Sequence, residues 1–137
     1  MPTIHLEIII DAAPAQVWDA VRDVGALHTR LVPGFVAGTE MLADTATPTR
    51  RVTFVNGVTA DEKIVSLDDE RRRLVWSIVG VEHHNGAMQV FDAGDGTRVT
   101  WTADLLPDAL VERFAPMMAA GLAKMKGHFE GTPALAG

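Results

Sequence analysis

The chain of 137 residues contains no cysteine, no tyrosine and only two serines, Ser66 and Ser77. Without cysteine it has no disulfide, no thiolate nucleophile and no Cys-ligated metal site. Both serines fall inside strand-like runs, so hydroxyl nucleophiles are scarce as well. Nothing in this composition requires an oxidising compartment, and we expect a cytoplasmic protein.

The chain also lacks a long hydrophobic run and an excess of positive charge. Its apolar N-terminal segment is interrupted by His5 and Glu7, so we expect neither a signal peptide nor a membrane span. The net charge of −6 argues against nucleic acid as a partner. No repeat, linker or low-complexity segment divides the sequence, so residues 1–137 are expected to form one domain. The sequence gives no indication of the oligomeric state.

The clearest element present is a long C-terminal helix, from Pro107 to about Gly131. Its apolar residues recur at intervals of three and four, which places them on one side of a helix. They are Leu110, Val111, Phe114, Ala115, Met118, Leu122, Met125 and Phe129. Pro116 lies inside this pattern and predicts a kink. Because the chain has no second long helix, we expect the apolar side to pack on a β-sheet.

The remainder of the chain is predicted to consist mainly of strands. An alternating run at Thr3–Ile10 is followed by two short helical segments, one between Asp11 and Gly25 and one over Leu27–Val32. Six further strand candidates, separated by short turn sequences, are Phe35–Leu42, Arg51–Asn56, Thr59–Ser66, Arg73–Val79, Glu82–Asp92 and Thr97–Leu106. Short connections make consecutive strands antiparallel neighbours. The sequence therefore predicts an α+β fold: a seven-stranded curved antiparallel sheet, two short N-terminal helices and one long C-terminal helix.

This order of elements, together with several motifs, resembles the START-like (SRPBCC) helix-grip superfamily. The opening IIIDAAPAQVWDAVRDVGAL is similar to its bacterial polyketide cyclase/dehydrase-like members. The runs NGVTA (56–60), SLDDERR (66–72) and SIVG (77–80) are similar to the plant abscisic acid receptors, which share the superfamily with the birch pollen allergen. The resemblance covers nearly the whole chain and implies a helix-grip fold around a ligand cavity. It leaves the function open, because one fold hosts many functions.

A curved sheet crossed by one helix is expected to enclose a cavity for a small hydrophobic or amphipathic ligand, such as a lipid, a polyketide or an isoprenoid-like compound. Strand alternation and the apolar side of the helix turn most of the expected lining inward, and the resemblance adds Glu62 and His83. The expected ligand-binding residues are Phe54, Val58, Glu62, Ile64, Trp76, Ile78, His83, Phe114, Met118 and Leu122. For the apolar ones, a filled core is the alternative interpretation. No metal and no cofactor is expected.

Glu62 and one of two adjacent histidines are the candidates for catalysis. An inward carboxylate without a cationic partner would have a raised pKa, which favours a functional site. The alternative for Glu62 is a carboxylate in water at the edge of the sheet. Adjacent strand residues point to opposite faces, so only one of His83 and His84 faces the cavity, and the resemblance favours His83. A cyclase/dehydrase-like enzyme with Glu62 and His83 as acid and base is therefore the alternative to a binding protein. Arg30 and Asp104 are the other usable groups.

The resemblance to the hormone receptors does not extend to their function. The proline of the receptors' gate loop is Thr59 here, and the Arg-Leu pair of their latch loop is His84-Asn85. Their hormone-binding lysine has no counterpart around Leu31–Pro33. We therefore expect neither hormone binding nor a phosphatase partner.

The last strand candidate carries two conflicting registers. Alternation places Val99, Trp101, Ala103 and Leu105 on the buried face, whereas alignment with the receptors turns Thr100 inward. We follow alternation, since a one-residue slip in the alignment is easier than a solvated tryptophan.

Overall fold

The computed structural model describes residues 2–131. Its elements, in chain order, are β1 (Thr3–Ile10), α1 (Pro14–Arg22), η1 (Leu27–Leu31), β2 (Val36–Met41), β3 (Thr49–Phe54), β4 (Thr59–Asp68), β5 (Arg73–Ile78), β6 (His83–Asp92), β7 (Thr97–Leu106), η2 (Asp108–Leu110) and α2 (Val111–Glu130). η1 is a π-helical turn and η2 a 3₁₀ turn. The prediction of one domain over residues 1–137 extends beyond the described residues at both ends.

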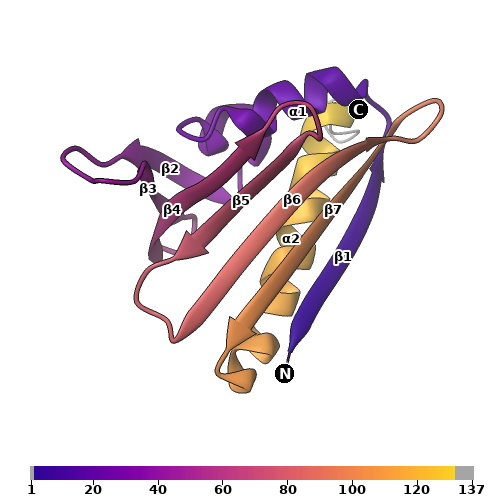
Figure 1. Ribbon diagram of the computed structural model, residues 1–137. Coiled ribbons are helices and arrows are strands. Elements are labelled where there is room, and N and C mark those ends of the chain that lie inside the picture. Colours follow the sequence, from indigo (N-terminus) through magenta and orange to yellow (C-terminus); the bar gives the residue numbers. More distant parts are fainter. Residues whose placement is uncertain (1, 132–137) are drawn as a thin grey trace.

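All seven strands form one antiparallel sheet in the order β1-β7-β6-β5-β4-β3-β2. Two bulges interrupt it, between Val36 and Gly38 in the β2–β3 pair and between Ile64 and Ser66 in the β4–β5 pair. Bulges bend a strand and increase its twist. The part of the sheet that holds β2, β3 and β4 curls away from β6, β7 and β1 (Figure 1). The predicted α+β helix-grip fold is confirmed.

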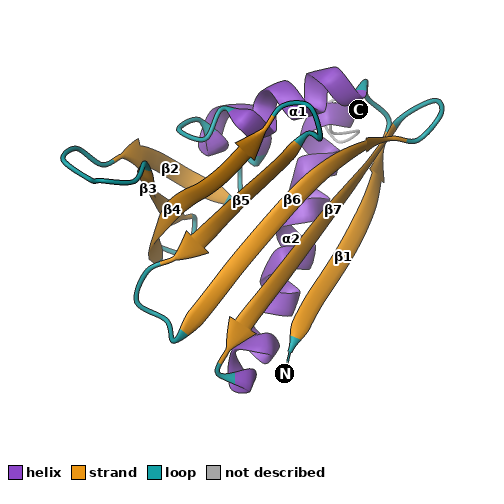
Figure 2. Ribbon diagram, viewed as in Figure 1, coloured by secondary structure: helices purple, strands orange, loops and turns teal. Residues whose placement is uncertain are grey.

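The long helix covers only part of the curved sheet. α2 runs along β6, β7 and β1, and α1 lies across one end of the strands (Figure 2). Met118 of α2 packs against Ile4 of β1 and against Ala103 and Leu105 of β7. Because the helix packs closely against the β1 and β7 side, the inner face of β3 to β5 is free to line an open space.

Some element boundaries differ from the predicted ones. β3 begins at Thr49, two residues before the predicted Arg51, and this moves Arg50 into the sheet. The C-terminal helix begins with the separate turn η2, and α2 then continues through Pro116 to Glu130. A proline removes one backbone hydrogen bond, which a long packed helix tolerates. Within residues 2–131, none of the helices is long and apolar enough to cross a membrane.

The register of β7 follows strand alternation. Val99, Ala103 and Leu105 are buried, and the ring centroid of Trp101 lies 5.8 Å from that of Trp76 inside the fold. Thr100 is also buried, but it borders a small polar depression elsewhere on the sheet, together with residues such as Thr102. The expectation that Trp101 points inward is confirmed.

Candidate functional site

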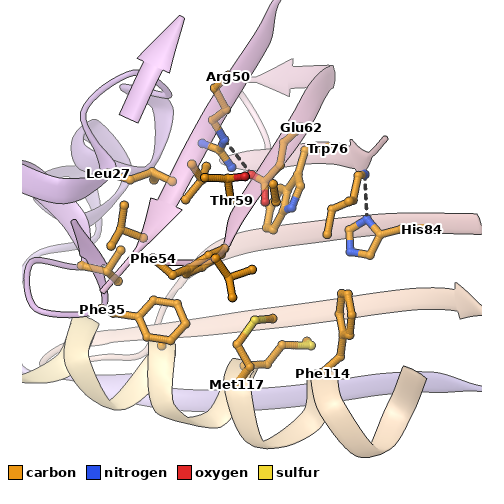
Figure 3. A pocket seen from close by; sticks show the side chains of 18 of the residues that line it. Leu27, Phe35, Arg50, Phe54, Thr59, Glu62, Trp76, His84, Phe114 and Met117 are labelled. Atoms are coloured by element: carbon orange, nitrogen blue, oxygen red, sulfur yellow. Dashed lines mark hydrogen bonds and ion pairs between the residues drawn. The ribbon is translucent and has the colours of Figure 1, made fainter. Parts of the chain in front are cut away.

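A cavity of about 870 Å³ lies between the curled part of the sheet and α2. Its walls come from the inner faces of β3, β4 and β5, from η1 and from α2, and Figure 3 shows it from close by. Leu27 of η1 lies on one side of it, and Phe114 and Met117 of α2 lie on another (Figure 3). Pockets that hold small molecules measure about 300–1,000 Å³, so this space is large enough for a ligand.

Aromatic rings form much of the cavity wall. Phe35 and Phe54 meet edge to face with their ring centroids 5.4 Å apart, and the Trp76 and Trp101 rings lie 5.8 Å apart. The wall at Trp76 depends on Gly86 of β6, because a Cβ at Gly86 would lie 3.0 Å from that ring. Real Cβ atoms rarely come so close, so the glycine lets the indole lie directly over the β6 backbone.

The opening of the cavity has an apolar rim. Val55, Val58 and Val79 line the cavity, yet their exposed fractions are 60%, 52% and 51%. Val55 and Val58 belong to the turn between β3 and β4, and Val79 follows β5. These valines give the cavity an exposed apolar edge, next to the polar side chains of Asn56 and Thr59.

The structure brings most of the predicted ligand-binding residues together around this cavity. Those that line it are Phe54, Val58, Glu62, Trp76, Ile78, Phe114 and Met118. Ile64 and Leu122 pack into the main hydrophobic core instead. Ile64 lies directly before the β4 bulge, and on α2 Gly121 and Met125 line the cavity at the level of Leu122. His83 does not line it.

A buried ion pair lies on the sheet side of the cavity. Arg50 of β3 donates from Nε to Oε1 of Glu62 on β4 at 2.8 Å, and from Nη1 to the carbonyl oxygen of Val24 at 3.3 Å. Its guanidinium carbon lies 5.4 Å from the centroid of the Trp76 ring, within cation–π range. Arg50 and Glu62 are only 2% and 6% exposed. Figure 3 shows the two side chains pointing toward each other beside Trp76.

Glu62 lines the cavity, but the condition of an inward carboxylate without a cationic partner is not met, because Arg50 pairs with it. Burial raises the pKa of the Glu62 carboxyl, while the charge and hydrogen bond of Arg50 oppose the rise. Arg50 was missed because the strand was predicted to start one residue later. Counting back in steps of two from the inward-facing Phe54 and Val52 leads to Arg50, so strand alternation contained the signal.

His84 is the histidine that reaches the cavity. It is 4% exposed, and its ring centroid lies 5.8 Å from that of Phe114. The backbone N–H of Ile78 donates to its Nδ1 at 3.2 Å. Because Nδ1 accepts this bond, a neutral ring carries its proton on Nε2 and offers a donor there. Burial, with a smaller contribution from His83, lowers the pKa of His84 to about 4, so the ring is neutral at pH 7.

The expectation that His83 faces the cavity is wrong. His83 is exposed at the start of β6, because side chains alternate along the strand and Met88 and Val90 already define the inward set. Counting back from these two residues leads to His84. The other two candidates for catalysis lie elsewhere: Arg30 pairs with aspartates of the α1 region, and Asp104 accepts a hydrogen bond from Thr3. Neither lines the cavity.

One buried donor near the cavity has no partner. Within residues 2–131, Trp101 Nε1 is the only buried side-chain nitrogen or oxygen without a hydrogen bond. Over the same residues, no group of three or more His, Cys, Asp or Glu side chains is placed to hold a metal ion. Among the residues that line the cavity, the buried polar side chains are those of Arg50, Glu62 and His84.

The sequence matches one protein family along nearly all of its length. Residues 1–130 match the family model described as "Polyketide cyclase / dehydrase and lipid transport". The chain belongs to this family. The predicted membership of the START-like superfamily is thereby confirmed. No curated protein matches the chain significantly.

Solved structures share the fold of this family member at low sequence identity. The protein XoxI from Bacillus cereus has a TM-score of 0.82 and 18% identity, covering 94% of this chain and 96% of its own. A protein from Nitrosospira multiformis has a TM-score of 0.81 and 17% identity, with 97% and 99% covered. A norcoclaurine synthase point mutant from Thalictrum flavum, in complex with a transition-state analogue, has a TM-score of 0.66 and 22% identity, with 93% of each chain covered.

Proposed function

We propose that this family member binds one small, mostly apolar molecule with few polar groups in the cavity between the sheet and α2. The observation that carries the proposal is a cavity of about 870 Å³ whose walls are mainly apolar and which contains the buried Arg50–Glu62 pair and His84. Such a combination is typical of small-molecule sites. The lipid transport named in the family description and the ligand-bound norcoclaurine synthase structure support it.

Blocking the cavity tests this proposal. Ala60 lies on β4 and lines the cavity, so Ala60→Trp should fill part of the space. We expect pyrene-type probes to bind the wild type, detected by probe fluorescence and by a rise in Tm, and to bind the A60W variant at least tenfold more weakly. Val65 of the same strand is 57% exposed and does not line the cavity, so Val65→Trp is the matched control. Equal binding by the wild type and A60W would contradict the proposal.

Acid–base catalysis is the second candidate function, with His84 in the role expected for His83. Glu62 pairs in the sheet with Ile78, whose N–H bonds to the His84 ring, and both side chains line one cavity. A Glu base and a His84 Nε2–H donor to an enolate oxygen would suit proton abstraction next to a carbonyl.

Exchange of α-protons in 2-tetralone, followed by NMR in D₂O, tests the catalytic candidate. We expect the wild type to accelerate the exchange and Glu62→Gln to abolish the acceleration without unfolding the protein. No acceleration by the wild type would reject catalysis of this kind and leave the binding proposal intact.

A further inference from the structure

The buried ion pair has one donor atom and one acceptor atom that form no hydrogen bond. Arg50 bonds to Glu62 through Nε and to the Val24 carbonyl through Nη1. Within residues 2–131, no group accepts a hydrogen bond from Arg50 Nη2, and none donates to Glu62 Oε2. In the neighbouring Arg51–Asp61 pair both carboxylate oxygens are bonded, because Nε and Nη2 each donate to one of them, at 2.8 and 3.0 Å. The Arg50–Glu62 pair thus keeps one free donor, Nη2, and one free acceptor, Oε2.

Both free atoms belong to residues that line the cavity. Trp101 Nε1 is the only unpartnered side-chain nitrogen or oxygen among residues 2–131 that is closed off from any open space. Arg50 Nη2 and Glu62 Oε2 therefore have access to space, although their residues are only 2% and 6% exposed. That space is the cavity, which both residues line.

A hydroxyl group matches these two atoms. Its oxygen accepts a hydrogen bond from Arg50 Nη2, and its hydrogen is donated to Glu62 Oε2. A hydrocarbon offers neither bond. A carboxylate has no hydrogen to donate, and it would bring a second negative charge next to Glu62, whose charge already neutralises Arg50.

The rest of the buried wall offers nothing to balance a second anion. His84 is uncharged, since its Nδ1 accepts the Ile78 N–H. Two further cations border the cavity, Arg51 of β3, which pairs with Asp61, and Arg113 of α2, and both are exposed. A bound anion would have to place its charge there and not at the buried pair.

We propose that Arg50 and Glu62 together bind one hydroxyl group, so that the ligand is a neutral, mostly apolar alcohol or phenol. This inference rests on the proposed ligand-binding function and names its substrate class. Contacts on three sides hold the guanidinium in place: Glu62, the Val24 carbonyl and the Trp76 ring. A site that is ordered before binding loses little entropy when the ligand arrives.

Three probes with the same ring system test the inference: 1-hydroxypyrene, pyrene and pyrene-1-carboxylate, titrated at pH 7 against the full chain. We expect the wild type to bind 1-hydroxypyrene at least tenfold more tightly than either of the others, as one or two hydrogen bonds to charged groups would produce. In the double variant Arg50→Met with Glu62→Leu, this preference should vanish while pyrene still binds. The matched control, Arg51→Met with Asp61→Leu, should keep the preference: that pair also borders the cavity, but both Asp61 oxygens are already bonded to Arg51 and the side chains are partly exposed.

The outcomes separate this inference from the function on which it rests. Equal binding of all three probes by the wild type, or tightest binding of the carboxylate, overturns the hydroxyl site and leaves a ligand-binding protein. A preference that survives in the R50M/E62L variant also overturns it. No binding of any probe overturns both proposals. If R50M/E62L does not fold by circular dichroism, Glu62→Gln replaces it, and the preference should fall because the carboxamide has lost the anionic acceptor.

Discussion

Two Arg–carboxylate pairs lie one residue apart on the same two strands, in opposite environments. Arg51 and Asp61 form a two-bond pair whose side chains are 47% and 31% exposed. Arg50 and Glu62 form a single-bond pair whose side chains are 3% and 8% exposed. The outer carboxyl has its pKa lowered by the Arg51 hydrogen bond, whereas burial raises the pKa of the inner one. Both pairs border the cavity, so the same chemistry gives a partly solvated pair in one case and a desolvated pair in the other.

The difference shows that position decides which charged pair matters for function. An exposed pair exchanges water for a partner at little net gain, so it contributes little to stability. A buried pair has lost its water, so its atoms depend on each other and on whatever enters the cavity. Four sets of variants test this difference between the two pairs.

The largest effect is expected from removing one member of the inner pair. Glu62→Leu leaves Arg50 buried with its charge and no anionic partner, and arginine does not lose its proton in proteins. We expect the free energy of unfolding to fall by about 3–5 kcal/mol in urea denaturation. The matched outer variant, Asp61→Leu, should cost less than about 1 kcal/mol. Similar losses for the two variants would show that the inner pair is hydrated.

Removing both inner charges should reverse most of this loss. In the R50M/E62L variant the buried site holds two apolar side chains, and no charge remains without a partner. Replacing a buried ion pair in this way ranges from neutral to about 4 kcal/mol stabilising. We therefore expect the double variant to be at least as stable as the wild type by the same urea titration. A loss close to that of Glu62→Leu would mean that the pair itself holds the fold.

His83 and His84 show the same difference between an exposed and a buried group, and the buried one predicts that stability depends on pH. The folded-state pKa of His84 is lowered to about 4 from 6.5, so the unfolded chain binds more protons between these values. The contribution of His84 to the free energy of unfolding is therefore fully present above about pH 6.5 and is lost as the pH drops toward 4. After allowance for solvent screening, we expect a loss of about 1–2 kcal/mol between pH 7.5 and pH 5.

Comparison of two variants isolates this dependence. His84→Gln should remove it, whereas His83→Gln, at the exposed position, should retain it. Urea denaturation at both pH values gives the change in unfolding free energy for each protein. A dependence that is the same in the wild type and in H84Q would assign it to other groups.

The smallest effect is expected at the outer pair. The double variant R51M/D61L should change the free energy of unfolding by less than about 1 kcal/mol, and the change should shrink further at high salt, because exposed charges are screened. Thermal unfolding at low and high ionic strength measures it. A salt-independent loss above this size would place Arg51 and Asp61 among the groups that hold the sheet together.

Patterns local to each element predicted the architecture well. The alternating runs predicted the seven strands, and the intervals of three and four along residues 107–131 predicted the helix that crosses the sheet. These patterns succeed because each follows from the geometry of one element and the need to bury one of its faces. The cavity itself was an expectation of the resemblance and of sheet curvature.

The details of the candidate site depended on where each strand begins and on which of its two alternating sets of side chains faces inward. Arg50 was missed because its strand was predicted to start at Arg51, and His83 was chosen over His84 although the apolar residues further along β6 indicate the opposite. Ile64 and Leu122 lie on the expected faces of their elements but pack into the hydrophobic core beside the cavity. Both placements depend on packing between distant segments, which the periodicity of one segment does not contain.

A substitution at Gly86 would change the volume of the interior. A methyl group at this position would lie within 3.0 Å of the Trp76 ring and 3.1 Å of the His84 ring, so both rings would have to move away from β6 into the hollow. A single alanine there would make the chamber shallower without removing any polar atom. Relatives that keep the ion pair but differ at this one position would accept guests of the same chemistry and of different size.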